Sequence, residues 1–451
     1  MADHAVVVIG TGPVGLSIAF ELATRGIDVA VVEALTVGSG AARRNAGWVV
    51  PIMAAPVPAP GVVGKAARWM FDPTSPLRVA PDLDPRHIAF MIGMLRASSP
   101  RRFEHGLAAV GALAEGTLDL FDAYAGRGVD FEMHRDGVLL AFTSHGEFEA
   151  HVKEYLDAAR VAGLSTPELL DAAGVREAEP GLADSVVAGI LCPDQMHLNP
   201  DSYVDGLRSA ITELGVPVLE GTSVTGLSVA SDRITLSSSH GSMSALQVVV
   251  AAGVGSARIV ASVGQRLPLR FGKGYGYDLA TPPVPLRRAV YLAEAKVAVT
   301  PLNDGMRLAG TMEFGGDPDR VDLRRAAGII TSSRPYFEGG IDTDRAPWAG
   351  LRPMTPDGLP VIGRMRRAPG VVVATGHAML GVTLAPRTGQ LVADLVEDRQ
   401  PPELSPFAVE RFEWGHAARR PANEVANEVA ICPPDSTSMS GLHMASVGCP
   451  S

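Results

Sequence analysis

The first 33 residues contain the feature that most restricts the fold: a strand, a glycine-rich turn, a helix and a second strand in immediate succession. Residues 5–9 are apolar and mainly β-branched, which is typical of a strand buried on both faces of a parallel sheet. A turn at 10–15 follows at once, and residues 16–25 have helical spacing. A second apolar strand at 27–32 ends at Glu33. This order predicts a dinucleotide-binding βαβ unit.

Each glycine of the turn has a different predicted task. Gly10 permits the tight turn, Gly12 lets the backbone approach a pyrophosphate, and Gly15 lets the helix lie close to the strand. The helix N-terminus offers unpaired N–H groups to phosphates, and an acidic residue after the second strand accepts hydrogen bonds from ribose hydroxyls. The predicted ligand contacts of this unit are Gly10, Gly12, Pro13, Val14, Gly15 and Glu33.

Composition and charge exclude several classes of protein. The chain has 39 basic and 49 acidic residues, a net charge of −10, and no basic block, which argues against nucleic-acid binding. Asp3 stands where a signal peptide carries Lys or Arg, and glycines or prolines interrupt the uncharged stretches 5–20 and 46–64. We therefore expect a cytoplasmic protein. The cysteines lack zinc-site spacing, so we expect reduced thiols and no metal: Cys192, Cys432 and Cys449.

Later segments favour FAD over NAD as the dinucleotide. Residues 246–256 form an apolar strand that ends in small residues, including Ala252 and Gly253, where a backbone can approach a ligand. Residues 222–227, with Val224, are another short β-branched piece. Distant segments that complete a nucleotide domain are typical of flavoproteins whose substrate domain is inserted into the FAD domain.

Over about residues 4–415 the sequence resembles the FAD-dependent amino-acid oxidoreductases of the D-amino-acid oxidase superfamily. Within it, the bacterial D-amino acid dehydrogenases are the most similar branch. Ordered segments carry this resemblance: 44–47, 54–61, 65–78, 273–275, 310–314, 348–360 and 375–386.

The resemblance implies an α/β and α+β fold, with a Rossmann-like FAD-binding domain and an interleaved mixed-sheet substrate domain. The FAD-binding domain would comprise 1–85, 196–265 and 346–416. Residues 86–195 would supply helical and substrate-domain segments, and 266–345 the rest of the substrate domain. Residues 417–451 depart from the family, and their polar, repetitive composition predicts a flexible tail.

The resemblance also extends the set of residues expected to hold FAD, which should be noncovalent. Residues 44–47 would form a loop over the flavin, and residues 377–383 would run along its ring. The helix after that run would present N–H groups to charge that develops on reduced flavin. The added residues are Arg43, Arg44, Asn45, Ala46, Gly47, Trp48, Val224, Ala252, Gly253, Gly350, Arg352, Gly376, His377, Leu380, Gly381, Val382 and Thr383.

Oxidation of an amino acid moves a hydride from Cα to flavin N5, so the protein must hold the carboxylate and the amine. Arg352 lies in the segment that resembles the family's carboxylate-binding motif, and its planar fork matches a carboxylate. Tyr275, with Tyr277 as the alternative, is predicted to line the pocket, although either could instead pack at a domain seam. His377 is expected as a flavin contact that could act as an acid or base. Met379 would lie near the substrate.

The leading hypothesis is oxidative deamination of a D-amino acid to a 2-oxo acid and ammonia. A second hypothesis keeps the fold but takes a secondary or cyclic amino acid, such as D-proline, hydroxyproline, a sarcosine-like compound or a biosynthetic amine. A third is a flavin-binding protein without turnover. Apolar residues within 51–100 form either a helical lid or a surface for a membrane or quinone. The expected partners are thus an amino-acid or amine substrate, a quinone or other acceptor, and a peripheral contact with the inner face of a membrane.

Overall fold

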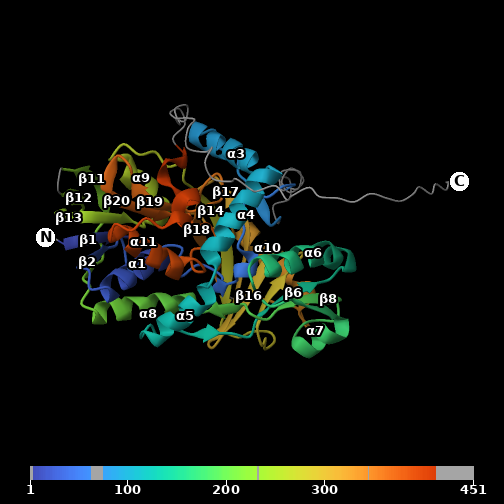
Figure 1. The fold of residues 1–451 in the computed structure, drawn as a ribbon. Helices are drawn as coiled ribbons and strands as arrows, with labels where there is room; N and C mark the ends of the chain where they lie inside the picture. Colours follow the sequence, from blue (N-terminus) through green and yellow to red (C-terminus); the bar gives the residue numbers. More distant parts are fainter. Residues whose placement is uncertain (1–3, 62–74, 231–232, 344, 413–451) are drawn as a thin grey trace, which may run out of the picture. The chain divides into compact units, whose positions relative to one another are not determined.

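Two large β-sheets carry the fold, and each is assembled from strands that lie far apart in the sequence (Figure 1). The computed structural model describes residues 4–61, 75–230, 233–343 and 345–412. The expected tail at 417–451 and most of the segment 65–78 therefore lie outside the described residues.

The first sheet has a parallel half and an antiparallel half. In the parallel half, β1 lies between β2 and β13, β2 also pairs with β10, and β13 also pairs with β20. In the antiparallel half, β13 pairs with β12, β12 pairs with β11, and β19 pairs with β20. The strands are β1 His4–Ile9, β2 Val29–Val32, β10 Val218–Leu219, β11 Val224–Val229, β12 Ile234–Ser238, β13 Gly241–Val250, β19 Val361–Met365 and β20 Ala368–Thr375.

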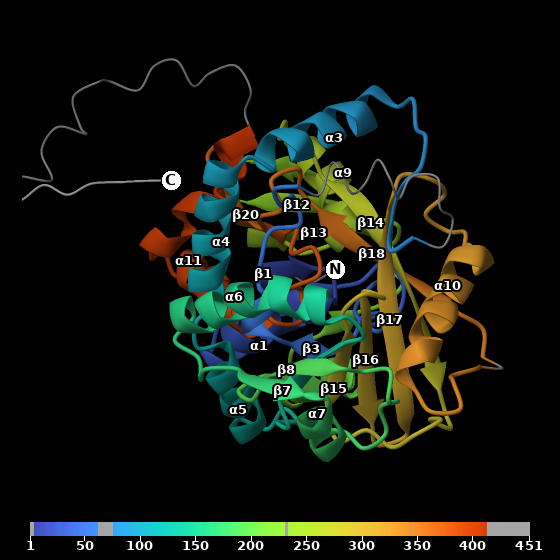
Figure 2. The same ribbon diagram turned by 90° about the vertical axis from the view of Figure 1, so that its right-hand side faces the viewer.

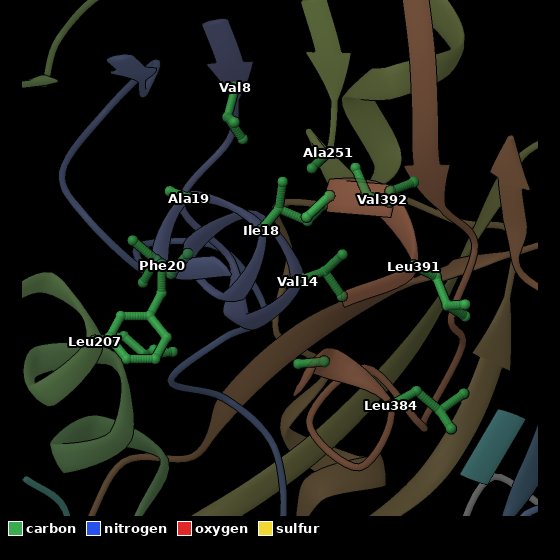
Figure 3. Close-up of a cluster of buried hydrophobic side chains, with 14 of the residues drawn as sticks. Val8, Val14, Ile18, Ala19, Phe20, Leu207, Ala251, Leu384, Leu391 and Val392 are labelled. Carbon is green, nitrogen blue, oxygen red and sulfur yellow. The ribbon is translucent and has the colours of Figure 1, made fainter. Parts of the chain in front are cut away.

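Both faces of the parallel half are buried, which explains the continuous apolar run in β1. Val6 and Val8 join a cluster with α1, α8 and α11, whereas Val7 and Ile9 join a cluster with α9. Figure 3 shows side chains of the first cluster from β1, α1, α8 and α11. The helices are α1 Pro13–Thr24, α8 Pro200–Glu213, α9 Ser256–Ala261 and α11 Ala385–Val396.

The second sheet is mixed and has the order β18-β14-β17-β16-β15-β6-β8-β7, with β4 also beside β17. Helices α7 and α10 pack on one face, and α6 covers part of the other (Figure 2). The strands are β4 Leu77–Val79, β6 Val138–Phe142, β7 Glu168–Asp171, β8 Ala188–Cys192, β14 Arg270–Leu279, β15 Ala289–Leu292, β16 Val297–Leu302, β17 Gly305–Phe314 and β18 Trp348–Met354.

The remaining elements connect or cover the sheets. A small third sheet contains β3 Trp48–Val49, β9 Met196–Leu198 and β5 Met133–His134. The other helices are α3 Pro85–Ala97, α4 Pro100–Ala114, α5 Thr117–Gly126, α6 His145–Val161, α7 Ala172–Ala178 and α10 Leu323–Ser333. Short 3-10 turns are Pro51–Met53, Gly253–Gly255, Arg334–Tyr336, Pro402–Phe407 and Val409–Phe412. Among the described residues, no helix has the length and apolar character needed to cross a membrane.

The expected fold class is confirmed: a Rossmann-like sheet is interleaved with a mixed sheet. The first sheet draws its strands from 1–85, 196–265 and 346–416. Two strands cross the expected domain boundaries, because β4 pairs with β17 and β18 pairs with β14. The mixed sheet therefore extends to Met354, and β18 joins it directly to the last segment of the Rossmann-like part.

Candidate active site

The carboxyl ends of the parallel strands meet at one edge of the first sheet. Gly10 follows β1, Glu33 follows β2, and Gly376 follows β20. Ala252 and Gly253 follow β13, and the Thr375 hydroxyl donates to the Gly253 carbonyl over 2.9 Å. Ligands of open α/β sheets bind at such an edge, where neighbouring connections run in opposite directions.

The three glycines of the turn differ in their surroundings as their predicted tasks require. A Cβ on Gly10, whose φ is 108°, would lie 2.5 Å from the Ala251 carbonyl oxygen. A Cβ on Gly15 would lie 2.0 Å from the Gly10 carbonyl oxygen, so helix and turn touch there. At Gly12 a Cβ would meet nothing within 4 Å. Gly12 is the N-cap of α1, directly before Pro13 and Val14. Because it forms no side-chain cap, the first N–H groups of the helix are left unpaired by the cap, which suits this helix end to a phosphate.

Glu33 is held in place and keeps capacity for a ligand. Its Oε2 accepts hydrogen bonds from the Thr11 N–H (3.0 Å) and the Thr11 hydroxyl (2.5 Å), and its Oε1 accepts from the Leu35 N–H. A carboxylate offers about four acceptor positions, so one remains for a ribose hydroxyl. The Thr222 N–H donates to the Glu33 carbonyl over 2.7 Å, which brings the segment before Val224 beside this site.

The loop 43–48 is fixed mainly by its own polar groups. Arg43 forms ion pairs with Asp201 and Asp205 of α8, and the Asn45 side chain bonds within the loop, accepting from the Gly47 N–H over 2.7 Å. The structure thus uses the Arg43 and Asn45 side chains to shape the loop. The exposed Arg44 donates to the Ala349 carbonyl over 3.2 Å.

Two residues that sequence reasoning missed attach this loop to the second sheet. Arg307 of β17, buried and paired with Asp278, donates to the carbonyls of Arg43 (3.1 Å) and Asn45 (3.0 Å). Thr300 of β16 accepts from the Trp48 indole N–H over 2.9 Å and donates to the Ala46 carbonyl over 2.7 Å. Only strand register brings these residues to the loop, so their local sequence carries no signal.

The segment 376–383 turns from β20 into α11. His377 is buried, and its Nε2 lies 3.1 Å from the Thr388 hydroxyl of α11. Burial lowers the pKa of His377 to about 3, so the imidazole is neutral near pH 7 and is a weak base there. The Leu380 N–H donates to the His377 carbonyl over 2.8 Å, which closes the turn before Gly381. Val382 and Thr383 are buried, and the Thr383 hydroxyl donates to the Trp48 carbonyl.

Strand β18 brings these cofactor segments to Arg352. A Cβ on Gly350 would lie 2.5 Å from the Arg44 carbonyl oxygen, and the Ala378 N–H donates to the Pro353 carbonyl over 3.0 Å. Arg352, between these two points, donates from Nη1 to the Thr311 carbonyl over 2.8 Å. Its guanidinium lies over Gly274, where a Cβ would be only 2.1 Å from Nη2.

Partial burial without a compensating charge characterises Arg352. In the parts of the chain that the structure describes, no acidic side chain pairs with it, and burial lowers the pKa of this arginine to about 10. Two other buried arginines of the second sheet region do have acidic partners. Arg307 lies 2.7 Å from Asp278, and Arg325 lies 3.2 Å from Glu313. Of these three arginines, Arg352 is the one whose guanidinium has no acidic partner among the described residues.

The two tyrosines predicted to line the pocket lie on the face of β14 opposite the one that meets Arg352. In β14 the even positions 274 and 276 are glycines that face Arg352 and Trp348 of β18. Tyr275 and Tyr277 point the other way, into the cluster covered by α10. The Tyr275 hydroxyl donates to Glu313 Oε2 over 2.7 Å. Strand alternation indicates which residues share a face, but it does not identify the face that meets the substrate.

Met379 is exposed, beside the left-handed Ala378, whose φ is 51°. Ala378 packs against Met312 and Met354, close to Arg352 in the fold. The structure therefore gathers Arg352, Met379 and the cofactor segments in one region and leaves the two tyrosines outside it. The open Gly12, the uncapped helix end and Glu33 fit the pyrophosphate and ribose of FAD at the adjoining sheet edge.

Comparisons with known proteins agree with this geometry. Residues 5–395 match the family described as FAD dependent oxidoreductase, and the chain belongs to that family. It is thus an oxidoreductase whose cofactor is FAD, and the resemblance inferred from the motifs is confirmed.

Individual relatives include D-amino acid dehydrogenases and a glycine oxidase. The chain is 35% identical to a D-amino acid dehydrogenase of Cereibacter sphaeroides, covering 92% of this chain and 97% of that relative. It is 33% identical to a D-amino acid dehydrogenase of Rhizobium johnstonii, covering 88% and 96%. Glycine oxidase from Geobacillus kaustophilus has a similar structure, with a TM-score of 0.71, 26% identity, and coverage of 91% and 99%.

The glycine geometry predicts that Gly12→Ala and Gly15→Ala fail differently. In Gly12→Ala the new Cβ has free space, so we expect stability of the apoprotein within about 1 kcal/mol of wild type but FAD affinity lowered at least tenfold. Gly15→Ala overpacks helix against turn and should cost roughly 1–3 kcal/mol in the apoprotein. Urea unfolding and FAD titration separate the two effects. Equal destabilisation of both apoproteins would contradict this assignment.

The buried His377 predicts a pH dependence of stability. Its pKa is about 3 in the folded chain but near 6.5 when unfolded, so the unfolded state binds the proton first as pH falls. The free energy of unfolding should fall between pH 6.5 and pH 5, by at most about 1.4 kcal/mol per pH unit from this group. His377→Gln should flatten the slope of urea-unfolding midpoints against pH. The exposed His240→Gln is the control, and equal slopes in wild type and His377→Gln would refute the prediction.

Proposed function

We propose that this protein oxidatively deaminates a D-amino acid to a 2-oxo acid and ammonia. Membership of the FAD-dependent family supplies the redox chemistry, and the relatives named D-amino acid dehydrogenase support the substrate class. The observation that carries the proposal is Arg352: a guanidinium that is half-buried, held by a backbone carbonyl, and without an acidic partner among the described residues.

The arrangement around Arg352 suits the carboxylate of an amino acid. One N–H of the guanidinium is occupied by the Thr311 carbonyl, which fixes the plane of the group and leaves its other donors for a ligand. Arginine and carboxylate form paired hydrogen bonds, and these are stronger where water is excluded. The surrounding groups are apolar: the Met312 sulfur lies 3.5 Å from Nη1, and Trp348 stands on the same strand face.

FAD held by these segments would supply the two-electron oxidation of the substrate Cα–N bond, and water would hydrolyse the resulting imino acid to the 2-oxo acid and ammonia. Arg352 holds the carboxylate and thereby fixes the direction in which the Cα–H bond points. The loop 43–48 and the segment 376–383, joined by the Thr383–Trp48 hydrogen bond of 3.1 Å, exclude water from the reacting atoms. His377 has a pKa of about 3, so the substrate amine must lose its proton to solvent before oxidation.

Replacement of Arg352 tests the assignment. Arg352→Met keeps the length of the side chain and removes the charge, so kcat/KM for a D-amino acid should fall at least about 30-fold, equivalent to ~2 kcal/mol. Steady-state assays with a soluble dye as acceptor measure this loss. Arg160→Met, at a highly exposed arginine of α6, is the control and should match wild type. Unchanged kcat/KM in FAD-loaded Arg352→Met would contradict the proposal.

The electron acceptor that we propose is a membrane quinone, reached by peripheral contact with the inner face of the membrane. Helix α3 supports this. Its inner face supplies Phe90 to a cluster with Met312, Phe314 and Met354, and Met91 and Met94 pack against this cluster, as does Ala378. Its outer face is also apolar, because Ile88, Ile92 and Leu95 recur at helical spacing and are exposed. Figure 1 shows α3 at the periphery, next to β14 and β17.

The positive charge of residues 85–103 favours an anionic lipid surface as the partner of the outer face of α3. Residues 85–103 carry four arginines, Arg86, Arg96, Arg101 and Arg102, and no acidic residue, in a chain whose net charge is −10. Apolar side chains flanked by basic ones are typical of helices that lie in the headgroup region of a bilayer. Since α3 separates this face from Met312 and Ala378, a bilayer docked here would lie one helix away from the active site.

Vesicle flotation tests this contact. The FAD-loaded protein should bind vesicles that contain anionic phosphatidylglycerol and should bind neutral phosphatidylcholine at least tenfold less well. Ile92→Glu should weaken binding at least tenfold, because it places a charge in the apolar stripe. Leu169→Glu is the matched control, since Leu169 is 47% exposed against 44% for Ile92 and lies on β7.

Absence of vesicle binding, or equal binding by Ile92→Glu and wild type, would refute the membrane contact. A dimer in sedimentation that Ile92→Glu dissociates would show that the outer face of α3 contacts a second copy of the chain and not lipid. Turnover with a soluble dye is independent of all three outcomes, so the deamination proposal is tested separately.

A further inference from the structure

A cluster of buried charged side chains lies behind the strand that carries Arg352, and the proposed chemistry does not use it. Arg325 of α10 is 1% exposed, Glu313 of β17 is 5% exposed, and Tyr275 of β14 is fully buried. Glu313 Oε2 lies 3.2 Å from Arg325 Nε and accepts the Tyr275 hydroxyl over 2.7 Å. Burial of charges is costly unless they are paired, so a cluster of this kind calls for a structural or functional reason.

The cluster is attached to a β-bulge. Lys273 pairs with Glu313 and Tyr275 pairs with Gly310, so Gly274 alone faces two residues of β17, Thr311 and Met312. Arg325 Nη2 lies 3.5 Å from the Met312 carbonyl, and the Met312 N–H donates to the Pro76 carbonyl over 2.7 Å. The backbone of the bulge is therefore held on the side of the sheet where α10 lies.

The same bulge also contacts Arg352 of β18. The Thr311 carbonyl accepts from Arg352 Nη1 over 2.8 Å, and the Met312 sulfur lies 3.5 Å from that atom. Both residues on the bulged strand thus touch the guanidinium. Any change in their backbone would change the direction of Arg352.

Thr311 shows that the bulge is strained. Its φ of 62° lies in the left-handed region, which a β-branched residue rarely adopts, and its buried hydroxyl has no hydrogen-bond partner among the residues that the structure describes. Such a conformation persists only where surrounding contacts impose it, and it is most frequent at functional sites. The charged cluster behind Met312 and the Pro76 contact provide such constraints.

We propose that Arg325, Glu313 and Tyr275 are positioning residues that hold the Thr311–Met312 bulge so that Arg352 is aligned for the substrate carboxylate. The inference rests on the proposed function of Arg352 as the carboxylate-binding group. The cluster acts through the backbone of the bulge and makes no contact with the ligand.

The test uses the FAD-loaded enzyme with Arg325→Met. We expect KM for a D-amino acid to rise about tenfold and kcat to change less than about threefold, because alignment for binding is lost while the hydride transfer of bound substrate is retained. Propionate, which has the carboxylate but no amine, should bind about tenfold less tightly when followed by the change in flavin absorbance. This second readout needs no turnover, so it remains valid even if wild type oxidises no D-amino acid.

Arg288→Met is the matched control. Arg288 also pairs with a buried acid, Glu179, over 3.1 Å, but the pair lies in another part of the fold. Its loss should lower stability and leave KM and propionate affinity unchanged. An equal rise of KM in both variants would show a general effect of destabilisation and would overturn the proposal.

Rescue gives the sharpest discrimination. Glycine adopts a positive φ without strain, so Thr311→Gly in the Arg325→Met background should hold the bulge and return KM to within about threefold of wild type. Failure of this rescue, or unchanged KM and propionate affinity in Arg325→Met alone, would overturn the proposal.

If Arg325→Met does not fold, Tyr275→Phe replaces it, since that variant removes one hydrogen bond to Glu313 and should raise KM about threefold. An unchanged KM in Tyr275→Phe would then overturn it.

Discussion

The hydrogen bond between Arg352 and the Thr311 carbonyl is the interaction on which the rest of the site depends. It holds a half-buried guanidinium that has no acidic partner among the described residues, so the positive charge stays available to a ligand. The bond exists because β14 presents glycines beneath Arg352 and because β17 carries an extra residue at the bulge. A side chain at Gly274 would occupy the position of the guanidinium itself.

Backbone contacts join this site to the cofactor-binding edge. Gly350 touches the Arg44 carbonyl on one side of Arg352, and Pro353 accepts from the Ala378 N–H on the other. The strand that holds the substrate group is therefore packed directly against two segments expected to hold the flavin. Because these contacts involve main-chain atoms, and residue 350 is a glycine without room for a Cβ, they keep the spacing between β18 and these segments constant.

The sequence was most informative where local chemistry determines structure. Gly10, Gly12 and Gly15 could be predicted because each is required within a few residues of β1 and α1. Alternation places Tyr275 and Tyr277 on one face of β14, as observed, but it does not say which face meets the substrate, and both point away from Arg352. Arg307 and Thr311 were missed because their roles depend on strand register over long sequence distances. Glycine at 274, within a strand, was the one local hint that a group approaches closely.

The most direct test of the central claim is an anaerobic titration of the FAD-loaded protein with the D- and L-enantiomers of the same amino acids, followed by the absorbance of oxidised flavin. The account predicts rapid bleaching by a D-amino acid and release of ammonia, with little bleaching by its L-enantiomer. Bleaching only by proline-like or N-methyl compounds, without ammonia, would contradict it. So would a flavin that no D-amino acid reduces.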